Sequence, residues 1–94
     1  ARQSPDYALT IRGDSMIETG IHDGDTVLIS KRAVARNGDI VVALVRQHEE
    51  TLKRMERRGE RVRLLPANPA YAVQEYPAAE VEIQGVLVGL LRWY

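Results

Sequence analysis

The chain has 94 residues, 13 basic and 13 acidic side chains, a formal net charge of zero and no cysteine. This length suits one domain, over 1–94, with a single modest core. The lack of cysteine excludes disulfides, thiolate metal sites and a cysteine nucleophile. With zero net charge, no overall field draws the domain to DNA or to an anionic membrane. The longest apolar stretches, 40–45 and 86–91, are far shorter than the ~20 residues of a membrane helix, so we expect a soluble domain.

Apolar residues recur mainly with a period of two, and turn dipeptides interrupt them at short intervals. This pattern is typical of an all-β domain. We predict at least six strands, in the segments 7–12, 26–31, 39–46, 51–56, 61–65, 80–84 and 86–94. The strand at 39–46 is apolar on both faces, so we expect it to be the most buried. The segment 66–79 contains three prolines and is predicted to be a loop with at most one helical turn.

The predicted strand at 51–56 carries a lysine on its less charged face. Because side chains alternate between the faces of a strand, Lys53 shares its face with Thr51 and Met55. The other face, which we interpret as the solvated one, carries Leu52, Arg54 and Glu56. Burial lowers the pKa of a lysine, and a neutral lysine can act as a general base. The strand pattern by itself favours a lysine whose amine extends to water.

A candidate nucleophile lies directly after the first predicted strand. Ser15 follows Gly13 and Asp14, where a sharp turn can expose its hydroxyl and direct successive backbone amides at one point. That arrangement suits a nucleophile beside an oxyanion hole. The same residues are more common in a simple turn or at a helix N-terminus, so neither this serine nor the lysine predicts catalysis alone.

Taken in order, several motifs resemble those of the LexA family of self-cleaving peptidases, to which UmuD-like mutagenesis proteins and phage repressors also belong. The shared motifs are Gly13-Asp14-Ser15-Met16, Gly20-Ile21, Asp23-Gly24-Asp25, Asn37-Gly38-Asp39, Thr51-Leu52-Lys53-Arg54, Leu64-Leu65-Pro66-Ala67-Asn68-Pro69 and Ile83-Gln84-Gly85-Val86-Leu87-Val88-Gly89. The resemblance extends over 7–94, nearly the whole chain. It implies an all-β fold of coiled antiparallel β-sheets and a serine-lysine dyad.

The resemblance also assigns roles to individual residues. It implies that Ser15 is the nucleophile, that Lys53 is its general base and that the Thr51 hydroxyl helps to hold the lysine amine. The backbone amides of Asp14 and Ser15 would form the oxyanion hole. Some relatives have methionine in place of Asp14, but a UmuD-like pattern has aspartate there. No metal or cofactor is expected, since the two histidines fit no metal-ligand motif.

Partners and location follow from the same resemblance. It implies a cytoplasmic repressor of the SOS DNA-damage response, whose self-cleavage is stimulated by the RecA filament and which has no contact with a membrane. The family cuts its own chain at an Ala-Gly or Cys-Gly bond well before the serine, yet only 14 residues precede Ser15 and no such bond occurs. The chain also begins without methionine. We therefore expect that the cleavage loop is absent, as is an N-terminal domain that would bind operator DNA.

Other readings stay open at this point. A UmuD-like or phage-repressor domain would process itself in the same way. A signal-peptidase relative would use the same dyad on membrane-translocated substrates, and would need a membrane anchor. A purely structural dimerisation module would carry the serine and lysine as inert residues.

We also predict a homodimer that forms through the C-terminal strand. Residues 86–94 are largely apolar on both faces, and an unpaired apolar edge is an aggregation hazard unless a partner covers it. Two-fold pairing of such strands would cover both copies. The alternative is that this strand lies in the centre of its own sheet and needs no partner.

Overall fold

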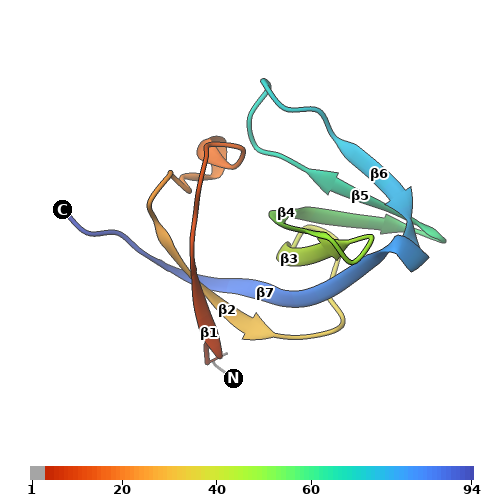
Figure 1. The fold of residues 1–94 in the computed structure, drawn as a ribbon, viewed down its shortest axis with the longest axis horizontal. Coiled ribbons are helices and arrows are strands. Elements are labelled where there is room, and N and C mark those ends of the chain that lie inside the picture. The colour runs from red at the N-terminus through yellow and green to blue at the C-terminus, as the bar shows by residue number, and fades with distance from the viewer. Residues whose placement is uncertain (1–3) are drawn as a thin grey trace.

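The computed structural model describes residues 4–94, and all of its strands belong to one antiparallel sheet (Figure 1). The strands are β1 (Tyr7–Thr10), β2 (Thr26–Lys31), β3 (Ile40–Val45), β4 (Glu49–Arg58), β5 (Arg61–Leu65), β6 (Gln74–Pro77) and β7 (Val81–Leu91). Two short 3-10 helices, η1 (Ile17–Thr19) and η2 (Ala78–Glu80), join them. The strand order is β1-β2-β7-β3-β4-β5-β6. The predicted all-β class is confirmed.

Strand β7 holds the two halves of the sheet together. Its C-terminal part pairs with β2 and its N-terminal part with β3. The register shifts between Leu28 and Ile29 of β2 and between Val42 and Ala43 of β3, and such irregularities bend a strand and increase its twist. The result is one strongly coiled sheet, in which β1 and β2 turn away from β4, β5 and β6 (Figure 1).

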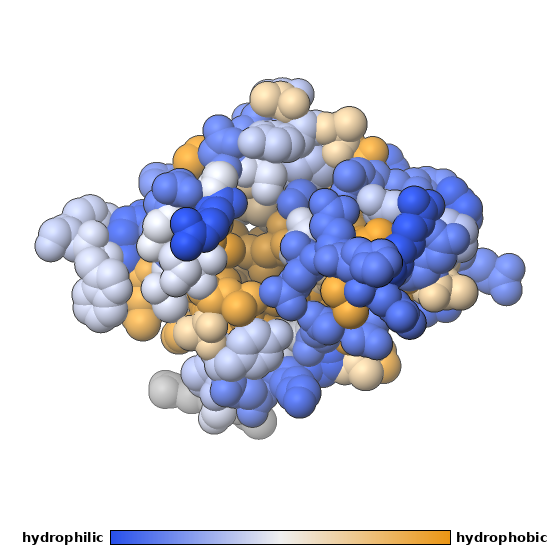
Figure 2. Space-filling view, viewed as in Figure 1, coloured by the Kyte–Doolittle hydropathy of each residue, from blue (hydrophilic) through white to orange (hydrophobic). Residues whose placement is uncertain are grey.

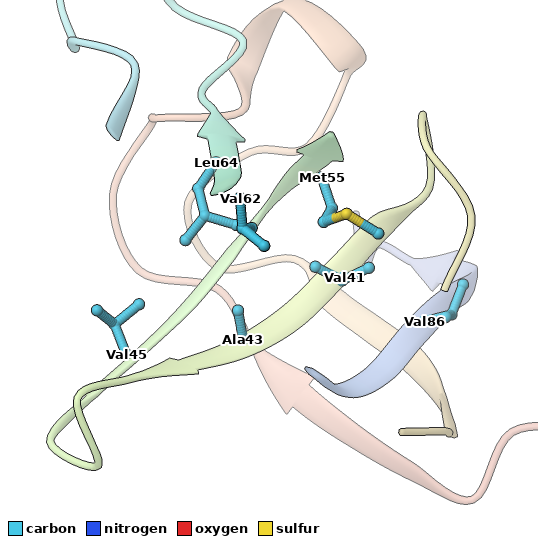
Figure 3. Packing of buried hydrophobic residues seen from close by; sticks show 7 residues of the cluster. All are labelled: Val41, Ala43, Val45, Met55, Val62, Leu64 and Val86. Atoms are coloured by element: carbon cyan, nitrogen blue, oxygen red, sulfur yellow. The ribbon is translucent and has the colours of Figure 1, made fainter. Parts of the chain in front are cut away.

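Strand β3 is buried on both faces, as its apolar sequence predicted. Alternate side chains belong to two separate core clusters, because successive residues of a strand face opposite sides. The first cluster, drawn in Figure 3, consists of Val41, Ala43, Val45, Met55, Val62, Leu64 and Val86. The second cluster consists of Met16, Ile21, Val27, Ile29 and Val42. It lies beneath the loop between β1 and β2, so it supports the segment that carries the candidate nucleophile.

Two predictions about the second half of the chain are wrong. The segment 66–79 is not simply a loop, because it contains β6 and the start of η2. Strand β6 lies at the edge of the sheet, where a proline such as Pro77 removes no hydrogen bond that the sheet needs. The two strands predicted at 80–84 and 86–94 are a single strand, β7, which continues through Gly85 and ends at Leu91.

The expected unpaired edge at the C-terminal strand is also wrong. Strand β7 has a neighbour on each side and is a central strand. The chain leaves the sheet after Leu91, and Trp93 is 80% exposed there. Any dimer contact at this end of the chain would therefore involve the tail after β7 rather than a free strand edge. Within residues 4–94, no helix is long and apolar enough to cross a membrane.

Candidate active site

The loop between β1 and β2 presents Ser15 above the second core cluster. Gly13 has a φ of 88°, in the left-handed region that favours glycine, and its amide donates a hydrogen bond to Asp23 Oδ1 at 2.7 Å. Met16 is 3% exposed and anchors the loop in the core. Ser15 itself is half-buried. A buried anchor next to a turn therefore fixes the position of the serine.

Residues 66–72, which we call the bracing loop, pack beside the Ser15 turn through four hydrogen bonds. The Ala67 amide donates to the Ser15 carbonyl at 2.7 Å, and the Glu18 amide donates to the Ala67 carbonyl at 2.8 Å. Asn68 Nδ2 donates to the Asp14 carbonyl at 2.9 Å, and the Tyr71 hydroxyl donates to Asp14 Oδ1 at 2.7 Å. The carbonyls of both residues at the predicted oxyanion hole are thus held in place from one side.

Strand β4 places Lys53 on an apolar face of the sheet. Lys53 lies opposite Val41 of β3, which is 0% exposed. Cross-strand partners project to the same face of the sheet. Lys53 Nζ donates a hydrogen bond to Thr51 Oγ1 at 2.6 Å. Burial lowers the pKa of Lys53 below its ordinary value, and the nearby Glu49 carboxylate opposes that shift. The lysine amine is thus biased toward its neutral form.

The face of β4 opposite Lys53 is less solvated than predicted. Leu52 packs against the second core cluster, whereas Arg54 is exposed and Glu56 is half-buried. The sheet coils at this point, so both faces of β4 contact protein. The expectation of a fully solvated face is wrong at Leu52, because a period of two reports alternation but not the curvature of the sheet.

Ser15 and Lys53 line the same cleft, which consists of two adjoining hollows. Both hollows are lined by Arg12, Ser15, Thr51 and Lys53. One, of about 280 Å³, has apolar walls from Leu9, Ile11, Met16, Val42 and Leu52. The other, of about 310 Å³, has polar walls that include Asp14, Glu49, Tyr71 and Gln74. Figure 2 shows, near the centre of the view, a hollow with apolar side chains at its floor.

The structure therefore brings the four residues singled out from the sequence into one cleft: Ser15, Lys53, Thr51 and Asp14. The sequence interpretation did not foresee the contacts of Asn68 and Tyr71. For Asn68 the sequence does contain a signal, the motif Leu64-Leu65-Pro66-Ala67-Asn68-Pro69. Nothing in that motif specifies a contact with the Ser15 turn.

The lining of the cleft includes a serine hydroxyl and a lysine amine. A half-buried lysine with a lowered pKa can accept a proton, and a hydroxyl that loses its proton becomes a nucleophile. Across residues 4–94, no group of three or more histidine, aspartate or glutamate side chains is placed to hold a metal ion. The residues that line the cleft are thus suited to acid-base and nucleophilic chemistry.

Comparison with known proteins defines the class of this domain. A family model described as Peptidase S24-like matches residues 1–88, and the chain belongs to that family. Its curated relatives include the LexA repressors of Ruegeria sp. (strain TM1040), Cereibacter sphaeroides and Gluconacetobacter diazotrophicus, each 58% identical to it over 88 residues. The resemblance to LexA-type proteins is confirmed.

The alignments cover 94% of this chain but only 36%, 39% and 35% of these three relatives, respectively. The chain therefore spans little more than a third of the length of the curated relatives that it matches. The parts of these relatives that lie outside the alignments have no counterpart in these 94 residues.

Proposed function

We propose that this chain is the C-terminal, self-cleaving serine peptidase domain of a LexA-type repressor of the SOS response, with Ser15 and Lys53 as its catalytic dyad. The observation that carries the proposal is that these two residues, far apart in the sequence, line one cleft in which burial lowers the pKa of the lysine. Membership of a peptidase family and the likeness to LexA repressors support it.

In the proposed reaction, neutral Lys53 takes the proton from Ser15 Oγ, and the oxygen attacks the carbonyl carbon of the scissile peptide. The protonated lysine then gives its proton to the leaving amine, and an ester forms on Ser15. Water hydrolyses this ester and restores the serine. The Thr51 hydroxyl, which accepts a hydrogen bond from Lys53 Nζ, would hold the amine in position for both transfers.

The backbone amides of Asp14 and Ser15 are the proposed oxyanion hole. The bracing loop donates hydrogen bonds to the carbonyl oxygens of both residues. By contrast, the hydrogen bonds formed within residues 4–94 include none that these two amides donate. Two free donors next to the nucleophile suit the negative charge that develops on the carbonyl oxygen in the transition state.

The remaining parts of the proposal concern partners. We expect a cytoplasmic homodimer that contacts its copy through the C-terminal end of the chain, where Leu91 and Trp93 are exposed. The RecA filament on single-stranded DNA would stimulate cleavage. Operator DNA would be bound by a separate N-terminal domain, for which the greater length of the curated relatives leaves room.

The test is self-cleavage of the full-length protein that contains this domain. Ser15→Ala and Lys53→Ala should each abolish cleavage, whereas Ser4→Ala and Lys31→Ala, at an exposed serine and at the only other lysine of the chain, should leave it unchanged. Addition of an activated RecA filament should accelerate the wild-type reaction. Cleavage at the wild-type rate by Lys53→Ala would overturn the dyad. A rate that the filament does not change would argue against an SOS repressor.

A further inference from the structure

Asp14, an ionisable residue beside the candidate nucleophile, lines the same polar hollow as Lys53. A carboxylate that reaches a lysine amine stabilises its protonated form and raises its pKa. Such a pair would work against a general base that has to be neutral. The ionisable groups that line the two hollows around Lys53 are Arg12, Asp14, Glu49, Glu50 and Tyr71.

Asp14 is nevertheless not paired with the lysine. Within residues 4–94, the ion pairs include none between Asp14 and Lys53. The Asp14 carboxylate instead accepts a hydrogen bond from the Tyr71 hydroxyl at 2.7 Å. The same hydrogen bond raises the pKa of the Tyr71 hydroxyl and so favours its protonated, donating form.

A turn in the bracing loop places Tyr71 within hydrogen-bonding distance of Asp14. Asn68 Oδ1 accepts a hydrogen bond from the Ala70 amide at 2.9 Å, and the Tyr71 amide donates to the Asn68 carbonyl at 3.1 Å. These bonds close a tight turn of the type that asparagine favours. Asn68 Nδ2 also donates to the Asp14 carbonyl. One asparagine thus forms the turn that carries Tyr71 and attaches that turn to the backbone of Asp14.

We propose that Tyr71 is a positioning residue for the self-cleavage reaction: its hydroxyl tethers the Asp14 carboxylate to the bracing loop and so keeps it from pairing with Lys53. This inference rests on the proposed function for its biological meaning. Its physical content, the control of the charge on Lys53, does not depend on cleavage. Tyr71 is 46% exposed and lies outside the core, so its hydroxyl can be removed without loss of packing in the interior.

The expected effect is an upward shift of the Lys53 titration when the tether is removed. An opposite charge within ~4–6 Å shifts a pKa by about 1–3 units. For a carboxylate that stays partly solvated we expect a pKa shift of about 0.7 units, which changes the neutral fraction of the lysine about fivefold. Tyr71→Phe keeps the ring and removes only the donor. Its self-cleavage rate at neutral pH should fall about fivefold, and the deficit should vanish at a pH above the shifted midpoint.

The direct test is an NMR titration of the lysine side chains in this chain, which contains only Lys31 and Lys53. In Tyr71→Phe, the Lys53 midpoint should move to higher pH while that of Lys31 stays constant as an internal reference. In the double variant Tyr71→Phe/Asp14→Asn, the Lys53 midpoint should return to the wild-type value or lower. Asp14→Asn alone should not raise it.

Tyr76→Phe is the matched control, because Tyr76 lines neither of the two hollows around Lys53. This substitution should leave the Lys53 midpoint unchanged. An unshifted Lys53 midpoint in Tyr71→Phe, or a shift that the Asp14→Asn change does not reverse, would overturn the tether. The titration reports on the lysine even if no variant cleaves, so failure of this inference is separable from failure of the proposed function.

Discussion

The Arg92 guanidinium binds both oxygens of the Asp25 carboxylate, with Nε to Oδ1 at 2.8 Å and Nη2 to Oδ2 at 2.6 Å. Nη2 also donates to the Gly20 carbonyl at 2.7 Å, at the residue that follows η1. This planar, two-point pairing is the strongest geometry available to an arginine and a carboxylate. It attaches the residue after β7 to the loop that carries Ser15, although the two segments lie at opposite ends of the chain.

The Asp25 carboxylate should make the stability of the domain depend on pH in the acid range. The hydrogen bond from Arg92, followed by that from the His22 amide, lowers the pKa of Asp25 from 3.8 to about 2. A carboxyl group whose pKa is depressed in the folded state stabilises the fold above its unfolded pKa. That contribution should be lost as the pH falls from 3.8 towards about 2.

Urea unfolding at a series of pH values measures this effect. Asp25→Asn should unfold at lower urea than wild type at pH ~7, and its stability should fall less steeply than that of wild type through the acid window. Glu60→Gln, at an exposed turn position, is the control and should follow the wild-type curve. Equal slopes for Asp25→Asn and wild type below pH ~4 would show that Asp25 does not have the depressed pKa.

A glycine in β7 permits the close packing of that strand on β2. A Cβ at Gly85 would collide with the core side chain of Ile29 and would lie 3.0 Å from the Ser30 carbonyl oxygen. Gly85→Ala should therefore destabilise the domain by about 1–3 kcal/mol, the usual cost of overpacking. At Gly89 the three atoms nearest to the added Cβ all belong to the Leu28 side chain, and the one tight contact, at 3.1 Å, is with its flexible end, so Gly89→Ala should cost clearly less.

Thermal or urea unfolding of the two variants tests the comparison. Both substitutions place the same residue in the same strand, so differences in strand preference cancel. If Gly85→Ala were as stable as Gly89→Ala, the close approach of β2 and β7 at this point would be incorrect.

The period-two pattern of apolar residues was enough to predict several strands. The segments 26–31 and 61–65 are strands with the predicted bounds. Turn residues precede both of them, at Asp23-Gly24-Asp25 and at Gly59, and Pro66 follows the second.

The predicted elements are wrong where a residue type is compatible with two kinds of structure, a strand and a turn or loop. Pro77 belongs to the segment predicted to be a loop, yet it lies on an edge strand. The predicted strands 80–84 and 86–94 leave out Gly85, yet β7 passes through it because the glycine serves packing rather than a turn.

The contacts that define the site could not be predicted from pattern. Asp14 and Tyr71, like Asp25 and Arg92, are joined across most of the chain, and a hydrogen bond of that kind leaves no periodic trace in the sequence. The resemblance to a known family brought Ser15 and Lys53 together in the interpretation. It did not supply the bracing loop, because that depends on how the turn at Asn68 packs against the turn at Ser15.

The hydroxyl of Thr51 should affect both the position and the pKa of Lys53, the proposed general base. A hydrogen-bond acceptor stabilises an ammonium more than a neutral amine, so Thr51→Val should move the midpoint of the pH-rate profile of self-cleavage to lower pH. The maximal rate should fall roughly tenfold, since the amine loses its orientation. Thr51→Ser retains the acceptor and should behave like wild type. A higher midpoint in Thr51→Val would contradict this role.

The tail after β7 should contribute to a homodimer. Light scattering at tens of micromolar should give twice the mass of one chain, and Trp93→Asp should reduce it to that of one chain without unfolding. Val34→Asp is the matched control, because Val34 is as exposed as Trp93, at 79% against 80%, but lies on another loop. Leu90 is unsuitable for this test, since it packs against the second core cluster. A single-chain mass for wild type would contradict the dimer.

The proposed pairing of Ser15 with Lys53 is tested most directly by the pH dependence of Ser15 labelling with a fluorophosphonate, a reagent that reacts with activated serines and needs no cleavage loop. The rate for wild type should rise with a midpoint below the ordinary lysine pKa of 10.5, because burial lowers the pKa of Lys53. Lys31→Ala should label like wild type, and Ser15→Ala should not label. Lys53→Ala should lose both the labelling rate and its pH dependence. Labelling of Lys53→Ala at the wild-type rate, with the same midpoint, would contradict it.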